Sequence, residues 1–241
     1  VETHGDWIAV GARDHSPSYE GIVYMYLTGS TGWVSSSVVC PLPNGSNYGA
    51  EFGASICLTS SLMAVGAPGK EKVFVYKSGS SGWALDATIS HPSSSTGDKF
   101  GMKVAIYEDT LAVGAPLNDV GGTNAGAVYL FSSSSAGGWT FFQGIAKGLV
   151  NGNAGAQMGG ALGIGSERLL IGAEIFSGSA EPGRPNAGYD GRAWLYKSGS
   201  SESISWTLEK TYKPDSSETM WAPRMAGSVA LSGDSIIIGS K

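Results

Sequence analysis

A short apolar segment that ends in glycine recurs five times along the chain, each time with the residue pattern of a buried β-strand. The five glycines are Gly11, Gly66, Gly114, Gly172 and Gly239. A large apolar residue followed by Gly or Ala lies 14 residues before each of the last four glycines, beginning at Phe52, Phe100, Met158 and Met225. Such constant spacing leaves no room for insertion, so each copy predicts two antiparallel strands joined by a tight turn.

Two further strand-like segments follow the glycine-ended strand in each copy. The first alternates aromatic and aliphatic residues, as in Val73-Phe74-Val75-Tyr76. The second begins at a tryptophan, which we expect to cover the edge of the sheet: Trp33, Trp83, Trp139 or Trp206. Each unit thus holds four short strands in about 50 residues, and no segment shows a sustained helical period. The predicted fold class is all-β, a β-propeller of four-stranded antiparallel blades, with about four to five blades in this chain.

Residues 100–131 carry the repeat in its fullest form. They read Phe-Gly-x-x-Val-Ala, an acidic turn, Leu-Ala-Val-Gly-Ala-Pro and then Gly-Ala-Val-Tyr. This order of motifs resembles the FG-GAP repeat, which builds the propeller of integrin α subunits and of many secreted proteins. The resemblance extends over essentially the whole chain. It implies one propeller domain over residues 1–241, with blade units at approximately 1–51, 52–99, 100–157 and 158–224 and a partial unit at 225–241.

The ends of the chain do not complete a blade. The Phe-Gly pair that should precede Gly11 would fall three residues ahead of Val1, so we expect the chain to begin at the second strand of a blade. The usual ring of the family has seven blades, and the resemblance therefore implies a window from a longer propeller. The alternative is a small closed ring whose spare strand is peeled away or paired with another chain.

Composition excludes two classes of partner. The chain has 37 glycines in 241 residues, a formal net charge of −5 and no block of basic residues. Nucleic-acid binding therefore has no electrostatic footprint. No apolar run approaches the roughly 20 residues that span a bilayer, so we expect no direct membrane insertion.

Metal binding and catalysis have little support in the sequence. Calcium-binding forms of the repeat carry alternating Asp or Asn residues between the first and second strands, and the turns here, such as Thr59-Ser60-Ser61, cannot supply them. Oxygens of Asn118, Asp119 and Asn124 could coordinate a cation, but capping of a Gly-rich turn explains these residues better. The histidines His4, His15 and His91 do not repeat in register, and no local pattern suggests a catalytic triad. We interpret the acidic residues Glu20, Asp86, Asp98 and Glu181 as solvated surface groups. We expect no cofactor, no metal and no enzyme activity.

Insertions collect in the loops between the second and third strands. From the glycine to the last aromatic of the third strand the separations are 15, 10, 17 and 24 residues, and the longest insertions span residues 117–124 and 175–190. Insertions on one face of a repeat protein often mark its binding face. The candidate partner-binding residues on this face are Asn118, Asp119, Asn124, Tyr189 and Trp221, although packing in the core or in an interface explains Trp221 better.

Two smaller features concern secretion. Asn44 heads an Asn-Gly-Ser sequence and is a candidate N-glycosylation site on the same face. Cys40 closes an outer strand and Cys57 lies in an inner strand, which should hold them too far apart to bridge, so we expect two unpaired cysteines.

These observations predict a non-catalytic extracellular or cell-surface module that binds a protein partner in adhesion or assembly. A lectin is the first alternative, since integrin-like propellers include proteins that bind glycans, but no aromatic and polar pocket recurs in each unit. An accessory domain of a larger secreted enzyme is the second alternative. The full-length reading frame would decide that alternative, and a glycan array would decide between the first two.

Overall fold

The computed structural model describes residues 1–15, 19–29, 32–40, 48–80, 82–93, 95–134, 138–146, 155–174, 191–199, 205–213 and 225–240. In this part of the chain the strands form four sheets of four strands and one pair of strands, with a single 3-10 turn at Pro68–Lys70. Every sheet is antiparallel, and neighbouring strands in a sheet follow one another in sequence. The fold is therefore all-β and consists of β-propeller blades, as the repeat predicted.

The strand bounds follow the repeat from sheet to sheet. The first sheet holds β1 (Glu2–His4), β2 (Trp7–Ala12), β3 (Ile22–Gly29) and β4 (Gly32–Cys40). The second holds β5 (Ser55–Leu58), β6 (Leu62–Ala67), β7 (Lys72–Gly79) and β8 (Gly82–Ser90). The third holds β9 (Lys103–Tyr107), β10 (Thr110–Ala115), β11 (Ala127–Ser133) and β12 (Trp139–Ile145). The fourth holds β13 (Ala161–Ile164), β14 (Arg168–Ala173), β15 (Arg192–Ser198) and β16 (Trp206–Tyr212), and β17 (Met225–Ser232) pairs with β18 (Ser235–Ser240).

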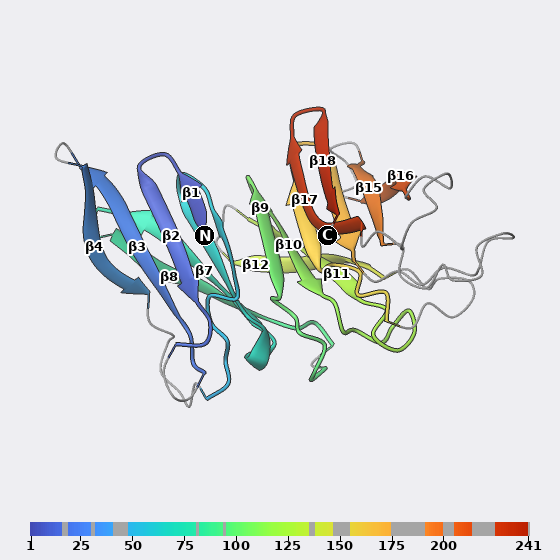
Figure 1. The fold of residues 1–241 in the computed structure, drawn as a ribbon, viewed down its shortest axis with the longest axis horizontal. Coiled ribbons are helices and arrows are strands. Elements are labelled where there is room, and N and C mark those ends of the chain that lie inside the picture. Colours follow the sequence, from blue (N-terminus) through green and yellow to red (C-terminus); the bar gives the residue numbers. More distant parts are fainter. Residues whose placement is uncertain are drawn as a thin grey trace, which may run out of the picture.

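The first strand of each blade is the innermost. The first strands contact one another in series, β1 with β5, β5 with β9, β9 with β13 and β13 with β17. Figure 1 shows the blue strands of the first blade on one side of the molecule and the strands β15 to β18 on the other, with β9 and β10 between them. The expected hairpin between the first two strands is present in the second blade, where Ser55 pairs with Gly66 and Leu58 with Met63. This confirms the predicted order of strands within a blade.

The N-terminal prediction is wrong in one respect. Residues Glu2–His4 form β1, a first strand paired with β2 through Glu2↔Ala9 and His4↔Trp7. The chain therefore enters its first blade within the first strand and not at the second. The sequence hid this strand because its three residues are polar and the Phe-Gly pair that marks the other first strands is absent from them.

The core lies between the blades rather than inside any one sheet. Phe52 packs with residues of the first and second sheets, Phe100 with the second and third, and Met158 with the third and fourth. All three side chains are fully buried. In these three repeats the large apolar residue thus fills the layer between its own blade and the preceding one.

The repeating glycines permit this close approach. A Cβ added to Gly114 of β10 would lie 2.1 Å from the carbonyl oxygen of Gly159, which follows Met158 at the entrance to the next blade. The equivalent pair of Gly11 and Gly53 shows the same 2.1 Å approach. The two signatures of the repeat, the glycine that ends strand two and the glycine after the aromatic residue, are therefore the two sides of one contact between backbones.

Candidate functional site

A cleft of about 470 Å³ opens at the mouth of the propeller, on the face where the loops between second and third strands emerge. Ten residues line it: Arg13, Asp14, Tyr19, Gly49, Glu51, Lys99, Met102, Pro116, Leu117 and Gln157. Each of them follows a second strand or precedes a first strand, so four blades contribute to the cleft at the same end of their sheets. This is the face to which the sequence assigned the long loops.

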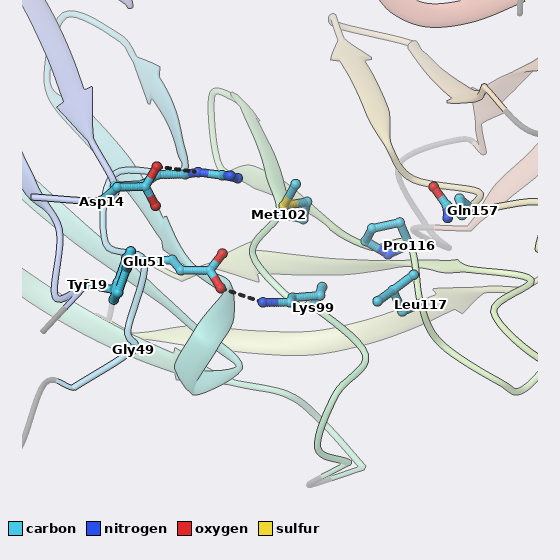
Figure 2. A pocket seen from close by; sticks show the side chains of 10 residues that line it. Asp14, Tyr19, Gly49, Glu51, Lys99, Met102, Pro116, Leu117 and Gln157 are labelled. Carbon is cyan, nitrogen blue, oxygen red and sulfur yellow. Dashed lines mark hydrogen bonds and ion pairs between the residues drawn. The ribbon is translucent and has the colours of Figure 1, made fainter.

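The walls of the cleft differ in character. Glu51 and Lys99 form an ion pair with an Nζ–Oε1 distance of 2.5 Å, and the pair is only partly exposed. Figure 2 shows this pair with Pro116 and Leu117 to one side of it and Met102 above Lys99. The cleft therefore offers a charged wall and an apolar wall to a ligand.

Three lining residues occupy the same position of the repeat. Glu51, Lys99 and Gln157 each stand directly before the buried Phe or Met, and their φ angles of 55°, 60° and 56° are left-handed. Backbone carbonyls of the first and third blades accept hydrogen bonds from the N–H of this residue and from the N–H of the buried residue that follows it. The N–H of Glu51 donates to Tyr19 O at 3.1 Å and the N–H of Gln157 to Asn124 O at 3.1 Å. The following N–H groups, of Phe52 and Met158, donate to the next carbonyl of the same loops.

At the junction between the second and third blades, the side chain of Glu71 accepts these hydrogen bonds in place of backbone carbonyls. It has a left-handed φ of 52° and stands where the other blades have Gly21, Gly126 and Gly191. Its carboxylate accepts hydrogen bonds from the backbone N–H groups of Lys99 at 3.0 Å and Phe100 at 2.7 Å, and also from Gly97 at 3.0 Å. The loop after β6 is the shortest of the series, and the carboxylate of Glu71 accepts the two N–H groups that carbonyls accept elsewhere.

A buried polar network lies beneath the same face, next to the third blade. Asp98 accepts a hydrogen bond from Asn118 Nδ2, which also lies 3.1 Å from the hydroxyl of Tyr129. His91 Nε2 lies 3.2 Å from Asp98 Oδ2, out of line for a hydrogen bond, so the contact is electrostatic. His91, Asp98 and Asn118 are all at most 5% exposed. The interpretation of Asp98 as a solvated group is therefore wrong: it joins the loop after β10 to the entrance of the third blade.

Ser93, His91 and Asp98 lie in a row, but the arrangement is structural. The hydroxyl of Ser93 is 3.0 Å from His91 Nδ1. The backbone N–H of Ser93 donates to the same nitrogen at 3.2 Å. Because this N–H already occupies the lone pair of Nδ1, that nitrogen is a poor base toward the hydroxyl.

The pH dependence of stability should report on His91. Burial lowers the pKa of His91 from its ordinary value of 6.5, against the smaller opposing effects of Asp98 and Glu71. Below pH 6.5 the unfolded chain therefore binds a proton that the folded chain resists, and stability falls as the pH falls. We expect urea unfolding to show a lower stability at pH 5.5 than at pH 7.5, and we expect His91→Gln to remove this difference. The exposed His4 provides the control: an equal effect of His4→Gln would contradict the assignment.

The structure divides the sequence-predicted partner residues into three groups. Asn118 is a core residue and not a surface contact, because its side chain bonds to Asp98 and Tyr129. Asp119 and Asn124 are exposed on the loop after β10, where Asp119 Oδ1 accepts the N–H of Asn124 at 2.8 Å, as expected for residues that cap a turn. Tyr189, Trp221 and the candidate glycosylation site Asn44 lie outside the described residues.

The tryptophans and Cys57 fill structural positions. Trp83, at the start of β8, packs edge-on against Trp7 of the first blade with ring centroids 5.9 Å apart, and Trp206 is buried between the third and fourth blades. Cys57 is unpaired, and its sulfur accepts the N–H of Ile106 on β9 at 3.2 Å. Burial raises the pKa of this thiol, so the group is kept in its protonated, less reactive form.

Chelation should leave the stability unchanged. In the described residues, no group of three or more His, Cys, Asp or Glu side chains is placed to hold a metal ion. We therefore expect the melting temperature to be the same with and without EDTA, since a ligand stabilises only the state that binds it. A fall of several degrees on addition of EDTA would show that a cation binds after all.

The cleft residues Arg13, Tyr19, Glu51 and Lys99 were not predicted from the sequence. A signal for Glu51 and Lys99 was available: both stand one position before the Phe of the Phe-Gly pair, in units that repeat in register. What the sequence could not show is that these positions converge, because convergence depends on how neighbouring blades are arranged around the mouth.

In the described part of the chain no helix is long and apolar enough to cross a bilayer.

Comparisons with known proteins agree with this architecture. The FG-GAP repeat matches residues 83–131, which span β8 to β11. A crystal structure of a protein from Lactobacillus plantarum superimposes with a TM-score of 0.51 at 11% identity, over 91% of this chain and 55% of that one. This chain thus spans about half the length of that protein, and the likeness concerns the fold alone. No curated protein sequence matches significantly. The chain is therefore a run of β-propeller blades that contains an FG-GAP repeat.

Proposed function

We propose that the chain is a non-catalytic binding module of an extracellular or cell-surface protein, and that it contacts a protein partner in adhesion or assembly. The observation that carries the proposal is the cleft at the propeller mouth, to which four successive blades contribute residues. A site assembled from several blades has a fixed shape, because each loop begins and ends on a packed strand. Extracellular placement is supported by the FG-GAP repeat, which is typical of extracellular proteins.

The surroundings of the cleft favour a protein as the partner. Tyr19 is 56% exposed at its edge, Tyr48 is 69% exposed beside Gly49, and Val120 is 71% exposed on the loop after β10. Exposed tyrosines supply large contact areas at low conformational cost, and they are enriched in protein interfaces. Catalysis is disfavoured by the blocked nitrogen of His91 and by the internal pairing of the charged residues in the cleft.

The test compares two faces of the same molecule. The double variant Tyr19→Asn/Tyr48→Ala removes the exposed rings, and asparagine suits the left-handed φ of 53° at residue 19. The matched control, Ser60→Ala/Glu167→Ala, alters two exposed residues in turns on the opposite face. Binding to the native extracellular assembly should fall at least about tenfold for the first variant and stay unchanged for the second.

Two results would contradict the proposal. One is equal binding by both variants, and the other is a loss confined to the opposite-face control. A glycan array run with the same proteins decides the lectin alternative. If the protein is a lectin, the wild type should bind one class of glycan and the Tyr19→Asn/Tyr48→Ala variant should not bind it.

A further inference from the structure

The residue before the buried Phe or Met is unusual in every blade in which the structure describes it. Glu51, Lys99 and Gln157 all adopt left-handed φ angles, a conformation that costs a residue with a Cβ roughly 1 kcal/mol relative to glycine. Glycine fills other left-handed positions of the repeat, such as Gly53 and Gly101, each two residues later. A position that keeps a long polar side chain despite this cost, and changes that side chain from blade to blade, is a candidate for recognition.

The three side chains line the same cleft. Each lines the mouth cleft, although Glu51 precedes the second blade, Lys99 the third and Gln157 the fourth. Their backbones are fixed by the hydrogen bonds to Tyr19 O, the Glu71 carboxylate and Asn124 O. The left-handed turn therefore holds one variable side chain per blade in a fixed position at the cleft.

We infer that this pre-aromatic position selects the partner, and that the cleft takes a peptide segment with an aliphatic side chain flanked by one basic and one acidic residue. The inference rests on the proposed function and names the chemistry of the segment bound. Met102, Pro116 and Leu117 form the wall that receives the aliphatic side chain. The basic residue faces Glu51 and the acidic residue faces Lys99.

Charge balance explains why both signs are required. Glu51 and Lys99 already neutralise each other, with their side chains 23% and 33% exposed. A segment that covers this pair strips water from both charges, which weakens the complex unless each charge gains a new partner. A segment with a single charge would satisfy one member of the pair and repel the other. A segment that carries both signs in the matching order satisfies both.

The experiment exchanges the two charges and keeps their pairing. A displayed library of random linear peptides is selected on the wild-type protein, and the enriched peptides are assayed on the double variant Glu51→Lys/Lys99→Glu by fluorescence anisotropy. The exchange restores an ion pair of opposite direction, so a thermal melt should show a folded protein. We expect the enriched peptides to bind the variant at least about tenfold more weakly. Peptides with their own two charges exchanged should regain the affinity.

Three results would overturn the inference. They are equal affinity for both proteins, enrichment of peptides that lack one of the two charges, and absence of any enriched peptide. A single variant, Gln157→Ala, serves as a control that removes a neutral side chain from the same position and should change affinity less than the exchange. If the native partner is lost from the Tyr19→Asn/Tyr48→Ala variant and binds the charge exchange normally, the proposed function stands and only this inference fails.

Discussion

Replacing Gly114 with alanine should destabilise the protein by about 3 kcal/mol or more, because the added methyl group would overlap the backbone of the next blade. The new Cβ would lie 2.1 Å from Gly159 O, and that atom belongs to the backbone of the next blade. Neither partner can rotate away, so the third and fourth blades would have to separate and open the layer that contains Met158. Urea unfolding followed by tryptophan fluorescence measures the change.

Gly144→Ala is the control for this prediction. Gly144 lies on β12 of the same blade, and a Cβ there would meet only side-chain atoms of Phe141 and Tyr129 at 3.8 Å or more. Both variants add one methyl group to a strand, and only one of them adds it between two backbones. Similar stabilities for the two variants would show that the blades are not held at the distance described here.

Glu71→Ala should cost about 3 kcal/mol, because three backbone N–H groups lose a charged acceptor at once. The N–H groups belong to Gly97, Lys99 and Phe100, and those of Lys99 and Phe100 are partly buried. Glu71→Gln keeps one acceptor oxygen and should cost less. We expect the melting temperature to fall in the order wild type, Glu71→Gln, Glu71→Ala.

Glu108→Ala separates the hydrogen bonds from the backbone conformation. Glu108 also has a left-handed φ, 49° against 52° for Glu71, and it is exposed in the turn between β9 and β10. Both substitutions place alanine in a left-handed conformation, so a similar loss for both would assign the effect to the backbone and not to the carboxylate. Surface substitutions of the Glu108 kind usually change stability by less than about 0.5 kcal/mol.

Periodicity in the sequence was enough to predict the blades. The 14-residue spacing between Phe100 and Gly114 fixes the hairpin of β9 and β10, and the alternation in Val73-Phe74-Val75-Tyr76 marks a strand buried on both faces. These signals are local, since each depends on residues of a single unit. The strand β1 was missed for the same reason: its three polar residues carry no signal of their own.

The site was harder to predict because it is built between units. Asp98 looked like a surface group in a Gly-Asp-Lys sequence, and only the arrangement of blades brings it against His91 and Asn118. Glu71 stands at a position where the repeat has glycine. Its carboxylate accepts N–H groups that backbone carbonyls accept at the other junctions, where the loop is longer. Spacing predicted which face carries the long loops, but it could not predict that Glu51 and Lys99 meet there.

The central claim, that the face bearing the mouth cleft is the binding face, can be tested by cross-linking the protein in its native assembly and mapping the linked residues by mass spectrometry. We predict that cross-links to the partner fall on Lys99 and on the loops around the cleft, such as residues 117–124. Cross-links concentrated on the opposite face, around Ser60, Asp109 and Glu167, would contradict the claim.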